Sequence, residues 1–138
     1  MAGSTGGIPK FNPQRRNARS GPQRLPAEGR QGDPPRWPLG PITIGEDEAW
    51  RELWATPQAV AWERLGWTRT VARYCRIMVE AEMPFAKAPV RAEARQLEDK
   101  LGLTPKAMRM LLWEVVEDEV EGKRQESSTG ARGRIKAV

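Results

Sequence analysis

Hydrophobic side chains recur with helical spacing through the middle of the chain and are scattered without a period in the first forty-one residues. The clearest pattern lies in residues 68–83. Its apolar positions follow the i, i+3, i+4, i+7, i+8 spacing of one helix face: Val71, Tyr74, Cys75, Met78 and Val79. Such a stripe predicts an amphipathic helix with one face in a core.

Start and stop signals set the bounds of the other elements. Thr56 and Thr104 each precede a proline, which is typical of an N-cap followed by the first helical residue. Gly66 and Gly102 end apolar runs, as C-terminal stops do. We expect an all-α fold with no sheet, with helices over these ranges: 45–55, 56–66, 68–83, 90–102 and 104–122.

The last predicted helix has two apolar sides. One carries Met108, Leu111, Leu112 and Val115, and the other carries Trp113, Val116 and Val120. Because a surface helix needs only one apolar stripe, we expect an antiparallel hairpin with the 90–101 helix and a second contact with another copy. The predicted oligomer interface comprises Met108, Leu111, Leu112, Trp113, Val116 and Val120.

The size of the predicted core also favours assembly. Residues 42–122 would bury only about 60% of their unfolded surface, which is marginal for an isolated domain. Large aromatic side chains more often fill such a core than contact a ligand. We therefore assign these residues to core packing: Trp50, Trp54, Trp62, Trp67, Tyr74 and Trp113.

Two basic tails are expected to flank this core. Residues 1–41 hold eight of the twelve prolines and seven of the thirteen glycines, a composition that predicts disorder. Residues 123–138 repeat the pattern of small, polar and basic side chains. The net charge is +5 in residues 1–41, −4 in 42–122 and +4 in 123–138.

Composition excludes several kinds of site. There is no histidine and one cysteine, so no disulfide within the chain, no Cys/His zinc site and no Ser-His-Asp triad can form. No apolar run approaches the roughly 20 residues of a membrane span. We expect a protein of the cytoplasm, without enzymatic activity, cofactor or bound metal.

The arginines indicate a polyanion partner, since seventeen of the twenty-three basic residues are Arg. Codon bias towards G and C is the alternative explanation for the tails. In the core, Arg69, Arg73 and Arg76 share the helix side opposite the apolar stripe, although an ordinary solvated face would look similar. The predicted DNA-binding residues are Arg15, Arg16, Arg19, Arg24, Arg64, Arg69, Arg73 and Arg76.

Two stretches have the helix-turn-helix form used to bind DNA. Residues 97–115 fit poorly, because the second helix offers only Lys106 and Arg109 before an acidic end. Residues 57–82 fit better through the Gly66 turn, although Trp62 is bulky for such a motif.

The runs "LWATPQAVAWERLGWTRTVARYCRIMVEAE" and "RQLEDKLGLTPKAMRMLLWEV" resemble the small terminase subunit of tailed double-stranded DNA bacteriophages, over about residues 37–115. The resemblance implies a non-enzymatic helical protein that forms rings of about eight to twelve subunits. It also implies binding at the packaging-initiation region of viral DNA, in the host cell cytoplasm. The expected partner is the large terminase subunit, which holds the ATPase and nuclease activities that the small subunit regulates.

Two other functions remain open at this point. A dimeric helix-turn-helix transcriptional regulator would carry the same motif, and an RNA-binding accessory protein would carry the same basic tails. If the tails bind DNA, deletion of residues 1–36 should flatten the salt dependence of binding and leave the assembly intact.

Overall fold

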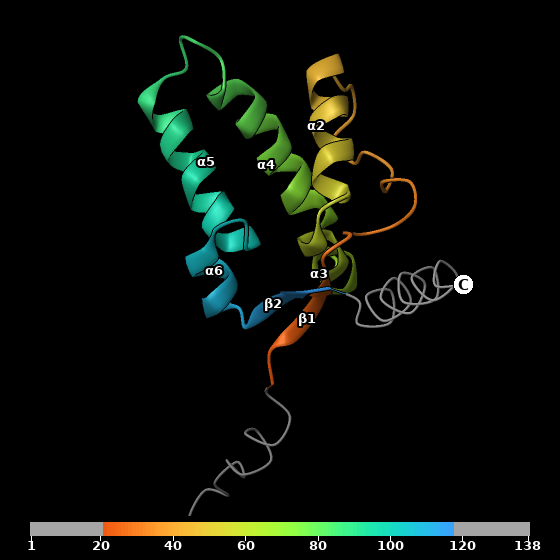
Figure 1. Ribbon diagram of the computed structural model, residues 1–138. Coiled ribbons are helices and arrows are strands. Elements are labelled where there is room, and N and C mark those ends of the chain that lie inside the picture. Colours follow the sequence, from red (N-terminus) through yellow and green to blue (C-terminus); the bar gives the residue numbers. More distant parts are fainter. Residues whose placement is uncertain (1–20, 118–138) are drawn as a thin grey trace, which may run out of the picture.

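The computed structural model describes residues 21–117. Its elements are β1 (Gln23–Pro26), α2 (Ile44–Trp54), α3 (Pro57–Leu65), α4 (Thr68–Ala81), α5 (Ala88–Leu101), α6 (Pro105–Met110) and β2 (Trp113–Val116). Helix α4 lies between α2 and α5, while α3, α6 and the two strands gather at one end (Figure 1). The prediction of a mostly helical domain is confirmed, and the prediction of no sheet is wrong.

The predicted helix ends are set by the residues that the sequence indicated. Thr56 and Thr104 are N-caps, and Gly66 and Gly102 are left-handed C-caps with φ of 71° and 73°. The Thr104 hydroxyl accepts a hydrogen bond from the Ala107 amide at 3.1 Å. These contacts satisfy backbone groups that a helix end would otherwise leave without partners.

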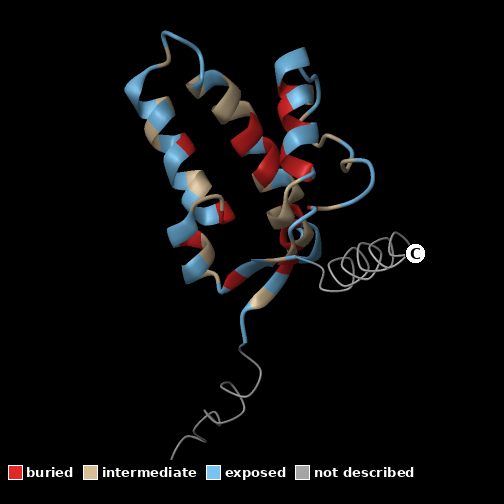
Figure 2. Cartoon of the chain, in the orientation of Figure 1, coloured by how far each residue is buried: buried red, intermediate tan, exposed pale blue. Residues whose placement is uncertain are grey.

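The core is built around the aromatic side chains, as predicted. Trp50, Trp54 and Trp62 of the predicted core, together with Trp37 from the predicted tail, form a chain of edge-to-face contacts with ring centroids 5.0–6.0 Å apart. The apolar stripe of α4 is buried against them or packed at their edge. In Figure 2 the buried positions gather where α2, α3 and α4 face one another. The Trp62 indole donates a hydrogen bond to the Leu101 carbonyl at 2.9 Å, which ties α3 to the end of α5.

Residues 21–41 are part of the folded domain, so the predicted tail of residues 1–41 is wrong over this range. Strand β1 pairs in parallel with β2, with Leu25 opposite Val115, and the Leu25 side chain is fully buried. The Arg30 guanidinium forms a bidentate ion pair with Glu63 on α3, with N–O distances of 2.9 and 3.0 Å. The core therefore begins well before residue 42. Residues 1–20 and the predicted tail 123–138 lie outside the described residues.

The helix predicted for residues 104–122 is also wrong over residues 111–117. Leu112 has φ of 58°, the one positive φ among the non-glycine residues of 21–117, and it turns the chain from α6 into β2. Trp113 then packs against the Gly102 turn, and its ring centroid lies 6.1 Å from that of Trp67. The two-sided helix on which the assembly argument depended is therefore not formed over residues 111–117, and Val120 lies outside the described residues.

Candidate nucleic-acid interface

The helix-turn-helix-like unit predicted in the first half of the core consists of α3, the Gly66 turn and α4. Gly66 takes the left-handed conformation, and the Trp67 amide donates to the Trp62 carbonyl at 2.9 Å, which closes the turn. Trp62 does not obstruct this arrangement, because its ring is fully buried beneath the unit. Helix α4 is thereby held by its apolar face, while its other face is open to solvent.

The open face of α4 carries basic side chains and no acidic ones near its start. Residues 64–79 contain four arginines and neither aspartate nor glutamate. Arg69 and Arg73 are exposed. Within residues 21–117 neither of them forms an ion pair, and the one side-chain hydrogen bond of Arg73 is donated to the Thr70 hydroxyl, at 3.5 Å. Both guanidinium groups therefore stay available to a polyanion.

Arg76, predicted on the same face, is engaged within the protein. Its guanidinium donates to both carboxylate oxygens of Glu46, at 3.2 and 3.4 Å, and to the Pro41 carbonyl at 3.0 Å. It also lies over the Trp37 ring, 5.4 Å from the centroid. Glu46 in turn caps α2 by reaching back to the Thr43 amide. These contacts join α4, α2 and the loop before α2.

Strand β1 and α3 add two further basic residues of the predicted set. Arg24 is exposed on β1. Arg64 is exposed on α3 and donates to the side-chain oxygen of Gln23 on β1. Arg64 on α3 thus contacts β1, the strand that carries Arg24. The remaining predicted residues, Arg15, Arg16 and Arg19, lie outside the described residues.

Arg36 is not among the predicted DNA-binding residues, because no pattern in the sequence places it beside α4. It is exposed and lines an open hollow of about 550 Å³ together with Arg69 of α4. The same hollow is lined by Trp37, Pro38, Gly40 and Ile42. The sequence offered one signal, namely that Arg36 is the single charged residue between positions 34 and 45.

The residues predicted as an oligomer interface have several different environments. Trp113 is buried in the chain's own core, and Met108 and Leu111 pack against that core. Leu112 is 52% exposed, and Val116 is half-buried. The members of this set within residues 108–116 therefore do not lie on one two-sided helix, as the sequence pattern had indicated.

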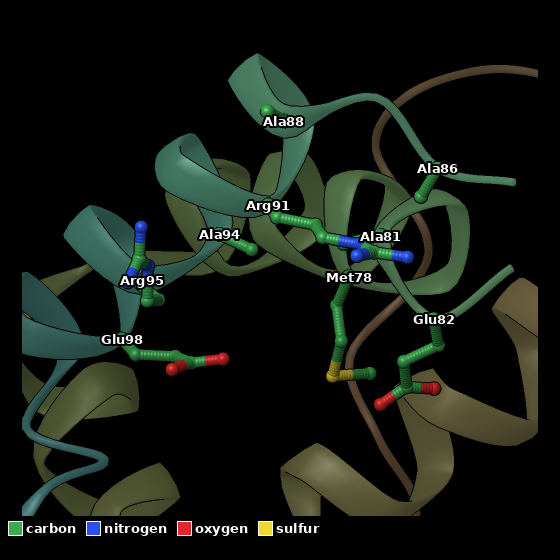
Figure 3. Close-up of a pocket in the computed structure, with 9 residues that line it drawn as sticks. All are labelled: Met78, Ala81, Glu82, Ala86, Ala88, Arg91, Ala94, Arg95 and Glu98. Atoms are coloured by element: carbon green, nitrogen blue, oxygen red, sulfur yellow. The ribbon is translucent and has the colours of Figure 1, made fainter. Parts of the chain in front are cut away.

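Another apolar surface lies at the N-terminal end of α5, away from α6. The α4–α5 connection exposes Met83 and Phe85, with Phe85 97% exposed. A groove of about 590 Å³ between the two helices lies beside this connection. In Figure 3 its lining comes from both helices, and the Arg91 side chain extends from α5 toward Ala81 of α4. Much of the lining is alanine, which leaves room for a larger side chain from outside.

Two buried titratable side chains, Tyr74 and Cys75, have raised pKa values. Burial raises the pKa of the Cys75 thiol to about 12, so the thiol is protonated near neutral pH and is a poor nucleophile. Burial and a 3.0 Å hydrogen bond to Glu98 raise the pKa of Tyr74 as well. Residues 21–117 contain no cluster of three or more side chains suited to a metal ion. No helix in that range is long and apolar enough to span a bilayer.

Comparisons with known proteins yielded no match. No family model matches this chain. No curated protein and no solved structure matches it.

Proposed function

We propose that this chain binds duplex DNA as the small subunit of a phage terminase, using the unit formed by α3, Gly66 and α4. The observation that carries the proposal is the exposure of Arg69 and Arg73 on a stretch of sixteen residues without a carboxylate. Arginine forks match phosphate oxygens, and the low local density of negative charge leaves the attraction uncompensated. The resemblance over residues 37–115 supports the more specific assignment.

In this mechanism each subunit contributes few phosphate contacts, and the assembly multiplies them through effective concentration. Phosphate contacts position the protein but carry no base sequence. Preference for a packaging-initiation region then requires DNA shape or base contacts from the first turns of α4. The bound assembly would present the large terminase subunit, with its ATPase and nuclease, to the viral DNA.

Charge reversal on α4 tests the DNA interface. We expect Arg69→Glu/Arg73→Glu to weaken binding of a 30-base-pair duplex by at least about 100-fold at low salt, since two attractive contacts become repulsive. Fluorescence anisotropy of the labelled duplex measures the affinity.

The control is Lys106→Glu/Arg109→Glu, which reverses two exposed basic side chains on α6. This pair also tests the helix-turn-helix form that residues 97–115 suggested. If both double variants lose the same affinity, binding depends on net charge and the α4 interface is rejected. Competition with duplex RNA separates the proposal from an RNA-binding function.

Self-association is the second part of the proposal, and we assign it to the α4–α5 connection and its groove. The occupant is the Met83–Phe85 segment of a second copy. The groove lining carries two acidic and two basic side chains, namely Glu82, Glu98, Arg91 and Arg95. Such a mixed rim is complementary to a second copy of itself, whereas a partner of one charge sign would meet repulsion from half of it.

Removal of the Phe85 side chain tests this surface. We expect Phe85→Ala to shift the protein toward the 15.5 kDa monomer and to raise the dissociation constant at least about tenfold, because an aromatic anchor is lost. Native mass spectrometry over a range of concentrations measures the subunit number.

Ile44→Ala is the matched control, because Ile44 is 82% exposed on α2 and does not line the groove. A wild-type protein that stays monomeric, or equal losses for both variants, would contradict this assignment.

A dimeric helix-turn-helix regulator is the second candidate function, favoured by the α3–Gly66–α4 unit itself. The same mass measurement separates the two functions. Eight or more subunits support a terminase ring, and two subunits support a regulator that binds a two-fold-symmetric site.

A further inference from the structure

The hollow beside the first turn of α4 combines two cations with an apolar floor. Arg36 comes from the loop before α2 and Arg69 from α4, so the two guanidinium groups enter from different elements. The remaining lining is Trp37, Pro38, Gly40 and Ile42. Two like charges on one open hollow repel each other unless an anion lies between them.

No carboxylate in the described chain neutralises this pair. Within residues 21–117 neither Arg36 nor Arg69 has an ion-pair partner or a side-chain hydrogen bond. The sequence from 34 to 45 contains no acidic residue. Glu46 follows directly, but its carboxylate is occupied by Arg76 and by the Thr43 amide. The hollow therefore retains its positive charge.

The loop that carries Arg36 is held on both sides of that residue. Before it, the Pro35 carbonyl accepts a hydrogen bond from the Trp50 indole at 2.9 Å. After it, the Pro41 carbonyl accepts from Arg76 at 3.0 Å, and Trp37 packs edge to face on Trp50. A site held in this way loses little conformational entropy when it binds a ligand.

We infer that Arg36 and Arg69 together clamp one phosphate group in this hollow, and that Arg76 positions the loop that carries Arg36. The inference rests on the proposed function, because it names the group through which that interface holds nucleic acid. The ligand chemistry is a phosphate oxygen, from either a nucleic-acid backbone or free phosphate. Arg36 is then a binding residue outside the predicted set, and Arg76 acts on binding indirectly.

A double-mutant cycle on the full chain tests whether the two arginines share one phosphate. We expect Arg36→Ala and Arg69→Ala each to weaken duplex binding about five- to tenfold and to lower the slope of log affinity against log salt by about 1. We expect the double variant to lose less than the product of the single effects, with the slope still lower by about 1. If the two substitutions weaken binding independently and the double variant lowers the slope by about 2, the shared site is rejected.

Arg109→Ala is the control for the loss of one exposed arginine. If Arg36→Ala behaves like Arg109→Ala while the wild type binds DNA, the inference fails and the proposed function stands. If the wild type binds no duplex DNA, the proposed function itself fails. Circular dichroism of each variant verifies that it is folded.

Free phosphate, added at constant ionic strength, shows whether the hollow binds the free anion or the phosphate of a nucleic-acid backbone. Phosphate that raises the thermal midpoint of the wild type, but not of Arg36→Ala/Arg69→Ala, shows a site for the free anion. Duplex binding that depends on both arginines without such a shift shows a site for the nucleic-acid backbone. If neither the thermal midpoint nor duplex binding depends on the two arginines, the clamp is rejected.

Arg76→Lys tests the positioning role, because lysine keeps the charge but not the paired contacts to Glu46 and Pro41. We expect a loss similar to that of Arg36→Ala, and no further loss when the two changes are combined. An additive loss, or full affinity in Arg76→Lys, would contradict positioning through Arg36.

Discussion

Removal of residues 1–36 is expected to unfold most of the domain, whereas removal of residues 1–20 should leave its stability nearly unchanged. The longer truncation deletes β1, the buried Leu25 and the Arg30–Glu63 ion pair. Truncating a buried leucine to alanine alone costs about 2–5 kcal/mol, and small domains have only about 5–15 kcal/mol in total. Urea unfolding, followed by tryptophan fluorescence, measures both truncations.

Leu25→Ala separates the loss of core packing from the loss of chain. We expect it to lower the free energy of unfolding by about 2–5 kcal/mol without removing any of the arginines proposed to contact DNA. A 1–36 truncation as stable as the full chain would show that β1 does not belong to the core. The earlier expectation that this truncation affects only the salt dependence of DNA binding is thus replaced by an expected loss of fold.

Trp62→Ala is expected to lower the free energy of unfolding by about 3–5 kcal/mol, because it empties the centre of the core. The ring of Trp62 is fully buried, contacts Trp54 edge to face and donates to the Leu101 carbonyl. For a domain of this size the loss corresponds to a fall of about 15 °C or more in the thermal midpoint. Differential scanning calorimetry measures both quantities.

Trp62→Phe is the matched variant, since it keeps an aromatic ring but removes the indole donor. We expect a smaller loss of about 1–3 kcal/mol, mainly from the buried Leu101 carbonyl that is left without its partner. A loss below about 1 kcal/mol in Trp62→Ala would contradict the central role given to this ring. Under the proposed function this substitution should weaken DNA binding too, because Trp62 supports the turn from α3 into α4.

The proposed DNA interface and the proposed contact between copies occupy different parts of the fold. Arg69 lies at the start of α4, and Phe85 lies beyond its end. A 14-residue helix is about 21 Å long, so the two surfaces can be occupied together. Substitutions at one surface should therefore leave the other property unchanged, which makes the two parts of the proposal separately testable.

Local patterns along the sequence predicted much of the candidate site, but they did not predict which arginines belong to it. The i, i+4 spacing of Arg69 and Arg73, opposite the apolar stripe, was sufficient to place both on the solvent side of α4. The i+7 spacing from Arg69 placed Arg76 there as well, yet Glu46 and Pro41 form hydrogen bonds with it. Spacing along one helix cannot report partners that another segment supplies. Arg36 was missed for the corresponding reason, since its loop has no period of its own.

The sequence by itself determined the first four predicted helices, within about two residues at each end, together with their caps and the aromatic core. These features depend on contacts three or four residues apart and on the chemistry of single capping residues. Only the tertiary structure decided the pairing of Gln23 with Trp113, 90 positions later, and the end of α6 at Met110. Val115 and Val116 suit a strand, but a four-residue strand forms only where a distant partner satisfies its backbone groups. Burial of Leu25 and Trp113 holds β1 and β2 together, so that each strand has such a partner. No pattern within either segment indicates this pairing.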